Sequence, residues 1–288
     1  MKEIAENVYI YTGNSLVTVG ALRTSDGWVC IDSLPYPKEA GAWLDALHNI
    51  GDGPVRYLVN TDYHRDRIIG NQWFEAPIVA HQFAARNILA LGDNFISQAA
   101  EVLSANKDEF VEMASLHLVP PQMSFSASLT LYAGDSAVDL VSRPGATAGS
   151  LWVILNDARV IFVGDTAITR QHPYIDSCAS KNWLEILRIL RQERYSDWTI
   201  VSGREGVVDI AQTEQLSEYL RVARRRVSGL LRTDGPRSEV SAFIPEMQEY
   251  FPIHNGRERT QRRIKAGLEA IYDEMRAIAE EAGEDEEE

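Results

Sequence analysis

The chain has 288 residues, of which 45% are hydrophobic and 24% are charged, and its formal net charge is −14. This composition predicts a globular protein with a large core, and the acidic balance argues against nucleic acid as a partner. No secretory signal pattern and no apolar run long enough to span a bilayer are found, so we expect a cytoplasmic protein without a membrane partner. Cys30 and Cys178 have neither the spacing of a metal site nor that of a redox motif.

The first part of the chain predicts a β-meander followed by alternating helices and strands. Strands are expected over residues 7–11, 15–22 and 28–31, because turn-forming Gly, Asn and Asp separate these apolar runs. Helical spacing covers residues 38–50, and the pattern from 81 to about 118 is again helical. Between these helices, strands are expected over 55–59 and 77–80.

The second part repeats this order. Strands are expected over 126–132, 136–141, 151–155, 160–163 and 199–201, and helices over 183–191, 210–231, 239–250 and 257–282. Strands followed by helices, twice, predict two packed sheets between layers of helices. We expect one main domain over 1–232, a helical extension over 233–279 and a disordered acidic tail over 280–288.

The C-terminal helices leave two alternatives for association. Leu268, Ile271, Met275 and Ile278 form an apolar stripe at helical spacing. This stripe either packs on the chain's own core or pairs two subunits in a homodimer.

Four Gly-containing loops follow predicted strands, and each can bring a polar side chain to a shared edge. They are residues 60–71, 144–150, 162–165 and 201–206. The first loop carries acidic and basic side chains at alternate positions, including Asp62, His64 and Asp66. These loops therefore predict one polar site.

The chain resembles the metallo-β-lactamase superfamily over about residues 7–208. Its motifs look most like those of the small soluble hydrolases of that superfamily. The resemblance lies in Asn-Thr at 60–61, Gly-Asn at 70–71, Gly-Ser-Leu-Trp at 149–152, Phe-Val-Gly-Asp at 162–165 and His-Pro-Tyr at 172–174. It implies an α/β fold of the αββα type, a four-layer sandwich of two mixed β-sheets flanked by helices. It also implies a two-metal hydrolase with a bridging hydroxide.

Four of the seven ligand positions that the resemblance implies carry other residues, all of them in place of histidine. His64, Asp66 and Asp165 match the family, whereas the exchanged positions hold Asp62, Arg67, Ala146 and Arg204. A guanidinium cannot lose its proton, and alanine has no donor atom, so three of these residues cannot bind a cation.

We therefore predict that two arginines replace the lost metal charge. Arg67 and Arg204 would pair with Asp66, Asp165 and Glu205, because several buried carboxylates need cationic partners. An inactive homologue of this kind would need no cofactor and would bind a small molecule or a protein. Asp66 is the candidate catalytic residue if a metal-free activity uses these acids and arginines.

A single metal ion is the alternative. Asp62, His64 and Asp165 offer two carboxylates and one imidazole, a set that suits Mn, Fe or Mg, or Zn, with a bound water. Such a site would support hydrolysis of a small ester, lactone or thioester. The competing interpretation makes His64 a hydrogen-bonded structural residue and Asp165 a turn cap or arginine partner. His172 would lie over the pocket as a lid, a substrate contact or a packing residue.

Overall fold

The computed structural model describes residues 1–14, 17–253 and 256–284. The chain divides into two compact units. The first unit comprises Met1–Arg143, Gly149–Gly164 and Asp197–Val208, and the second comprises Pro144–Ala148, Asp165–Ser196 and Asp209–Glu288.

A seven-stranded sheet in the first unit follows the order of the sequence. Its first four strands pair antiparallel, and the last four, β4 to β7, pair parallel. The predicted meander is therefore present, and a change to parallel pairing follows it. The strands are β1 (Lys2–Ala5), β2 (Val8–Thr12), β3 (Thr18–Thr24), β4 (Gly27–Ile31), β5 (Val55–Val59), β6 (Ile78–His81) and β7 (Met123–Phe125).

A six-stranded sheet, also in the first unit, has the order β13-β12-β11-β10-β9-β8. Only its β11–β12 pair is parallel, so this sheet is mixed as well. The strands are β8 (Ser128–Ala133), β9 (Ser136–Ser142), β10 (Leu151–Leu155), β11 (Val160–Phe162), β12 (Thr199–Ser202) and β13 (Gly206–Val208). Two mixed sheets with flanking helices confirm the predicted αββα fold class.

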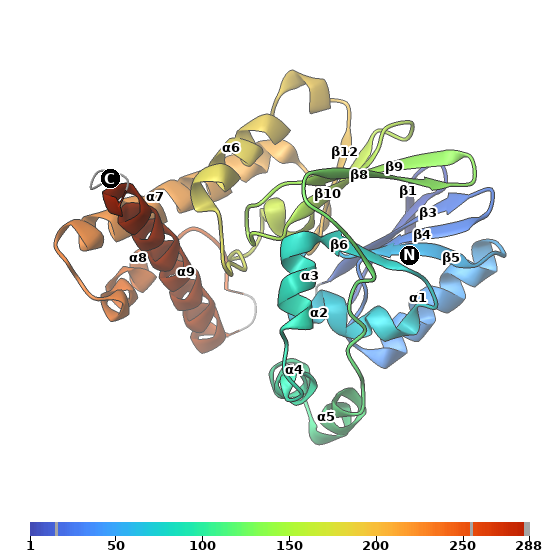
Figure 1. Ribbon diagram of the computed structural model, residues 1–288, viewed down its shortest axis with the longest axis horizontal. Coiled ribbons are helices and arrows are strands. Elements are labelled where there is room, and N and C mark those ends of the chain that lie inside the picture. Colours follow the sequence, from blue (N-terminus) through green and yellow to red (C-terminus); the bar gives the residue numbers. More distant parts are fainter. Residues whose placement is uncertain (15–16, 254–255, 285–288) are drawn as a thin grey trace. The chain divides into compact units, whose positions relative to one another are not determined.

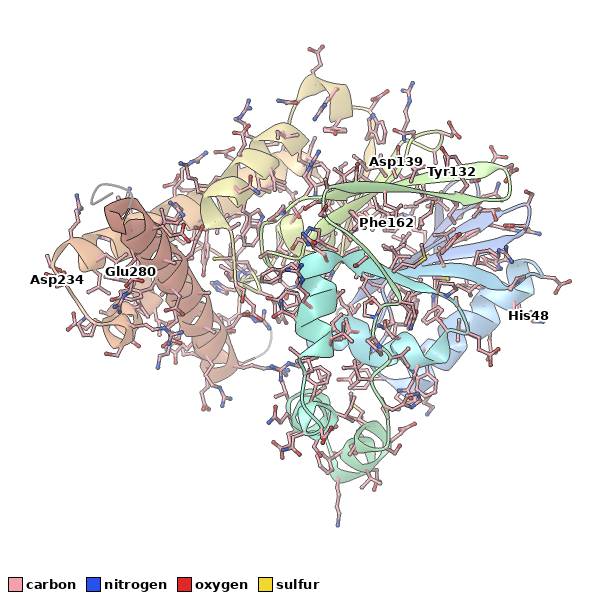
Figure 2. The ribbon with its side chains drawn as sticks, viewed as in Figure 1. His48, Tyr132, Asp139, Phe162, Asp234 and Glu280 are labelled. Carbon is pink, nitrogen blue, oxygen red and sulfur yellow. The ribbon has the colours of Figure 1, made fainter. Side chains whose placement is uncertain are left out.

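The two sheets pack through apolar side chains. Phe162 of β11, labelled in Figure 2, is buried. A Cβ atom added at Gly20 of β3 would lie 2.2 Å from its ring. The absence of a side chain at Gly20 therefore makes room for this ring, since interiors leave few voids.

In the sequence, the helices of the first unit lie between strands that form the seven-stranded sheet. α1 begins with Pro37, a residue suited to the first turn of a helix, and buries Ala40, Trp43 and Leu47. The predicted helical stretch from 81 onward is three short helices, and Asn106 caps the last of them by accepting from the backbone N–H of Glu109. The bounds are α1 (Pro37–Ile50), α2 (Arg65–Ile68), η1 (Ile69–Trp73), α3 (Gln82–Leu89), α4 (Phe95–Leu103) and α5 (Lys107–Ala114).

The second unit is helical in its described residues, and Figure 1 shows α9 beside α7 and α8. Leu268 and Ile271 of the apolar stripe are buried in this unit's own core, while Ile278 is exposed. Met275 is partly buried and packs against this core, so three of the four stripe residues pack within the chain. The elements are η2 (Gly164–Thr166), α6 (Ser180–Leu190), η3 (Glu193–Tyr195), η4 (Ile210–Gln212), α7 (Thr213–Arg232), η5 (Arg237–Phe243), α8 (Ile244–Gln248) and α9 (Arg257–Glu284).

Several bounds differ from the sequence prediction. The short strands β1, β7 and β13 are additional, and the helix predicted over 239–250 is a 3₁₀ helix followed by a five-residue α-helix. α9 reaches Glu284, so the helix includes the start of the predicted disordered tail, whose residues 285–288 lie outside the described residues. The predicted strand over 15–22 begins at Thr18, and residues 15 and 16 also lie outside them. The predicted domain boundaries stay a prediction.

Within the described ranges, no helix is both long enough and apolar enough to cross a membrane.

Candidate functional site

Polar residues that follow three strands of the first unit meet at one place. Asp32 follows β4, Thr61 and Asp62 follow β5, and Gly203 and Arg204 follow β12. Arg67 of α2 joins them. We call Asp32, Asp62, Asp66, Arg67 and Arg204 the arginine–carboxylate cluster; all five side chains are buried.

Arg67 is the centre of this cluster. Its side chain is fully buried, and Nη1 donates to Thr61 Oγ1 at 2.9 Å and to Asp32 Oδ2 at 3.3 Å. The same nitrogen lies 3.5 Å from Asp62 Oδ2, while Nη2 donates to the carbonyl oxygen of Gly203 at 3.3 Å. One guanidinium thus connects the ends of β4, β5 and β12.

Two glycines form the walls around this guanidinium. A Cβ atom at Gly203 would lie 2.4 Å from Arg67 Nη1, a distance that real structures do not show. A Cβ atom at Gly164 would lie 3.4 Å from Nη1 and 2.8 Å from Thr61 Oγ1, and Gly164 also has a φ of +55°. The backbone here is shaped to hold an arginine side chain closely.

Asp32 is the member of the cluster that the sequence analysis did not select. Its Oδ1 accepts from the backbone N–H of Thr61 at 2.8 Å, and its Oδ2 accepts from the Thr61 hydroxyl at 2.7 Å. Burial raises the pKa of Asp32, and the charge of Arg67 opposes that rise. Asp32 has a φ of 58°, which aspartate tolerates better than most residues.

Asp62 and His64 contact each other directly. Asp62 Oδ1 accepts from the backbone N–H of His64 at 2.9 Å, and Asp62 Oδ2 lies 3.0 Å from His64 Nδ1. Asp62 therefore holds the His64 ring while it also lies next to Arg67. This contact supports the structural interpretation of His64, and it leaves its role toward a metal as a prediction.

Asp66 and Arg204 form a two-point ion pair. Arg204 Nη1 donates to Asp66 Oδ2, and Nη2 donates to Asp66 Oδ1 at 3.2 Å. Burial alone would raise the pKa of Asp66, but the charge and hydrogen bonds of Arg204 outweigh it and lower this pKa below its usual range. The predicted pairing of Arg204 with Asp66 is thus present. Arg67 contacts Asp32 and Asp62, which were not among its predicted partners, and its charge also contributes to lowering the pKa of Asp66. Its pairing with Asp165 and Glu205 stays a prediction.

Three predicted site residues belong to the second unit. Asp165 is buried and directly follows Gly164, and its role as a third metal ligand stays a prediction. Ala146 is buried and accepts a backbone hydrogen bond from Asp176 at 3.0 Å. His172 packs edge-on against Tyr219 and Phe251, and its Nε2 lies 3.1 Å from the carbonyl oxygen of Phe251.

The burial of His172 has an electrostatic consequence. Desolvation lowers the pKa of His172 to about 4, so the ring is neutral at neutral pH. The ring contacts with Tyr219 and Phe251 are packing contacts, and the roles of lid and substrate contact stay predictions.

The chemistry of the cluster can be tested against the two metals that the fold family implies. Arg67 and Arg204 occupy two ligand positions with permanent positive charge and no lone pair for a cation. Both are held by carboxylates that a metal would otherwise use. These residues do not fit a pair of metal ions.

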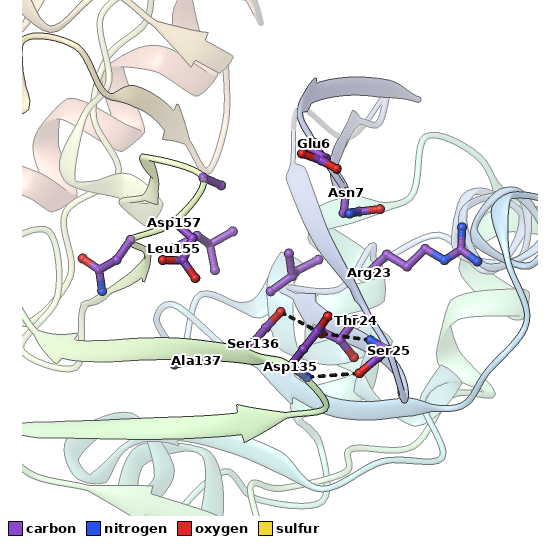
Figure 3. A pocket seen from close by; sticks show the side chains of 13 residues that line it. Glu6, Asn7, Arg23, Thr24, Ser25, Asp135, Ser136, Ala137, Leu155 and Asp157 are labelled. Carbon is purple, nitrogen blue, oxygen red and sulfur yellow. Dashed lines mark hydrogen bonds between the residues drawn. The ribbon is translucent and has the colours of Figure 1, made fainter.

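A cavity of about 450 Å³ lies elsewhere in the first unit and contains none of the predicted site residues (Figure 3). Its walls are four turns between strands. Two of these turns are joined because Ser25 N–H donates to Asp135 Oδ1 and Asp135 N–H donates to Ser25 Oγ, both at 3.1 Å. These bonds tie the β3–β4 turn to the β8–β9 turn.

The chain belongs to the metallo-beta-lactamase superfamily, whose family model matches residues 12–204. Solved structures of the same fold include a metallo-beta-lactamase family protein of Thermus thermophilus, with 18% identity and a TM-score of 0.66, covering 96% of this chain and 95% of that one. An archaeal superfamily protein of Sulfolobus tokodaii has 14% identity and a TM-score of 0.55, covering 93% and 98%.

A third structure is larger. The stereoselective inverting sec-alkylsulfatase of a Pseudomonas species has 13% identity and a TM-score of 0.67, covering 94% of this chain. This chain spans about half of the sulfatase, 49% of its length. At these identities the likeness shows the fold alone.

Proposed function

We propose that this chain is a metallo-β-lactamase-fold protein without the two-metal hydrolytic centre, and that it serves a binding or structural role. The observation that carries this proposal is the fully buried Arg67, which contacts Asp32 and Asp62 at a position where the family resemblance implies a metal ligand.

Electrostatics supports the proposal. Buried carboxylates without a counter-charge are costly, and two guanidinium groups supply that charge for Asp32, Asp62 and Asp66. A cation placed among the same carboxylates would be repelled by Arg67 and Arg204. This charge balance supports a site whose loops need no metal ion to hold them together.

Metal content and chelation test this proposal directly. Protein purified without chelator is subjected to elemental analysis, and its thermal midpoint is measured with and without EDTA. We expect less than about 0.1 metal ion per chain and no shift of the midpoint, since only a ligand that binds the folded state stabilises it. Two tightly bound metal ions per chain would overturn the proposal.

A mononuclear hydrolase is the second candidate. Asp62, His64 and Asp165 are of residue types that can bind a metal ion, two through a carboxylate and one through an imidazole. The His64→Ala variant tests it, with His48→Ala as the matched control because His48 is highly exposed. If the chain is a mononuclear hydrolase, we expect one metal ion per chain in wild type and in the His48→Ala control, and none in His64→Ala.

Turnover separates the candidates further. The panel includes a carboxylic ester, a lactone, a thioester and, in view of the sulfatase likeness, a secondary alkyl sulfate. Activity that appears on loading with Mn or Fe and disappears in His64→Ala would favour the mononuclear enzyme. Metal-independent turnover that is lost in Asp66→Asn would favour a metal-free enzyme.

A cytoplasmic location stays a prediction.

A further inference from the structure

One face of helix α9 contacts a neighbouring segment of the second unit. Arg263, Gly267 and Glu274 lie on this face, because positions four and eleven residues apart return to nearly the same side of an α-helix. They contact residues 171–180, which connect η2 to the start of α6. We call these residues the 171–180 segment.

Arg263 holds the beginning of the segment. Its guanidinium carbon lies 3.6 Å from the centre of the Tyr174 ring, and Nη2 donates to the Tyr174 hydroxyl. Nη1 donates to the carbonyl oxygen of His172 at 3.3 Å and to Gln171 Oε1 at 3.4 Å. Stacking and hydrogen bonding together make this contact specific for arginine.

Gly267 allows close approach in the middle. A Cβ atom at this position would lie 3.2 Å from Ile175 Cδ1 and 3.3 Å from Ile175 Cβ. The helix backbone therefore packs directly against Ile175, and even a methyl group would push on it.

Glu274 holds the end of the segment. Its carboxylate accepts from the hydroxyl of the buried Ser180 and from the Cys178 thiol, whose sulfur lies 3.6 Å from Oε2. Arg224 of α7 donates to Ser180 Oγ and lies 3.5 Å from Glu274 Oε2. The carboxylate thus connects α9 to the start of α6.

The opposite side of the segment is bonded to the loop that contains Ala146. The backbone N–H of Asp176 donates to the carbonyl oxygen of Ala146 at 3.0 Å, and that of Ala179 donates to Gly145 at 3.1 Å. In return, Ala148 N–H donates to the carbonyl oxygen of Ser177 at 2.9 Å. Ser177 has a φ of 43°, so this backbone needs its surroundings to hold it.

We propose that α9 is a latch for the 171–180 segment, so that loss of the Arg263 and Glu274 contacts releases the segment and the Ala146 loop bonded to it. The apolar side of α9, with Ile264, Leu268 and Ile271, is buried in the core of the second unit. Ile175 and Cys178 of the segment are buried in the same core, so they keep their apolar contacts when the two polar contacts are lost. The segment therefore opens locally, at the backbone next to these polar contacts, while α9 stays docked.

The latch gives the C-terminal helix a conformational role toward the segment that contains His172 and toward the Ala146 loop. α9 lies outside the residues 12–204 that the family model matches. The inference rests on contacts within the second unit and does not depend on whether a metal binds.

Hydrogen–deuterium exchange of the full chain tests the latch. Arg263→Ala and Glu274→Gln are compared with the matched controls Arg262→Ala and Glu280→Gln, whose side chains are exposed. We expect the amides of Ala148, Asp176 and Ala179 to exchange at least about tenfold faster in the two test variants, with amides of α7 and the β-strands unchanged. The controls should match wild type.

Two results would overturn the proposal. One is unchanged exchange at those three amides in both test variants. The other is an equal rise in α7, which would mean that α9 contributes only general stability. If Arg263→Ala does not fold, Arg263→Lys and Gly267→Ala decide by the same readout, because lysine keeps the charge without the planar fork and the added methyl pushes on Ile175.

Discussion

Arginine has two different roles in the two units of this protein. In the first unit, Arg67 is fully buried and contacts carboxylates that are buried as well. In the second unit, Arg263 is only partly buried and contacts an aromatic ring, a backbone carbonyl and an amide side chain. The first arrangement balances charge away from water, whereas the second joins two segments next to water.

This difference decides how each arginine can act. Removal of a buried partner leaves an uncompensated charge, so the cost is high and concerns the whole unit. Removal of a solvated partner lets water replace the lost bonds, so the effect stays local. The arginine–carboxylate cluster is therefore suited to permanent assembly, and the α9 contact to reversible opening.

The largest effect is expected for Arg67→Ala. This change leaves Asp32 and Asp62 buried without their guanidinium and should lower the free energy of unfolding by about 3–5 kcal/mol. Urea denaturation measures it, and Arg56→Ala is the control because its pair with Asp26 is exposed and should contribute less than about 1 kcal/mol. Equal stability of both variants would contradict the buried-charge role.

A smaller loss of unfolding free energy, about 3 kcal/mol, is expected for Arg204→Met alone. This change leaves the buried Asp66 carboxylate without its guanidinium partner. Adding Asp66→Leu should recover most of that loss, because an apolar pair of similar volume often replaces a buried ion pair without cost. A double-mutant cycle with denaturation of all four proteins measures the coupling. Additive losses would mean that the two side chains do not stabilise each other.

The free energy of unfolding should depend on pH in a way that reflects the protonation of His172. Its pKa of about 4 in the folded protein lies below the unfolded value of about 6.5, so the unfolded chain binds more protons between these values. The contribution of neutral His172 is therefore complete above about pH 6.5 and is lost as the pH falls toward 4, by at most about 3 kcal/mol. His172→Gln should remove this part of the slope; an unchanged difference between pH 7 and pH 4.5 would argue against it.

The smallest effects are expected for two glycine substitutions that change the free energy of unfolding in opposite directions. Gly203→Ala places a methyl group on the Arg67 guanidinium and should cost about 1–3 kcal/mol. Gly41→Ala in α1 meets no atom within 4 Å and should stabilise by up to about 1 kcal/mol. Thermal melts of the two variants in parallel measure both, and a neutral Gly203→Ala would mean that the space around Arg67 can adapt.

Most strands could be predicted because their apolar runs are bounded by turn residues, as at 28–31 and 55–59. β7 and β13 have three residues each, too short for alternation to be recognised, and they exist because neighbouring strands supply hydrogen bonds. The stretch after 81 has helical spacing throughout, but spacing alone does not reveal where one helix ends and the next begins.

The candidate site was predictable only in part for a related reason. Asp62, His64 and Asp66 share one loop, so their chemistry can be recognised from local sequence. Asp32 follows β4, and nothing in its neighbourhood indicates that parallel pairing with β5 brings it to Thr61 and Arg67. Which carboxylate each arginine contacts depends on strand register, a property of the folded sheet.

The close fit of Gly164 and Gly203 around Arg67 also constrains how this protein can change. Replacing Arg67 by histidine in one step would leave Asp32 and Asp62 without their shared cation and would leave a space shaped for a longer side chain. Replacing Arg204 alone would strand Asp66 in the same way. A change to histidine at these two positions would therefore pass through unstable intermediates, so single substitutions at Arg67 and Arg204 are disfavoured.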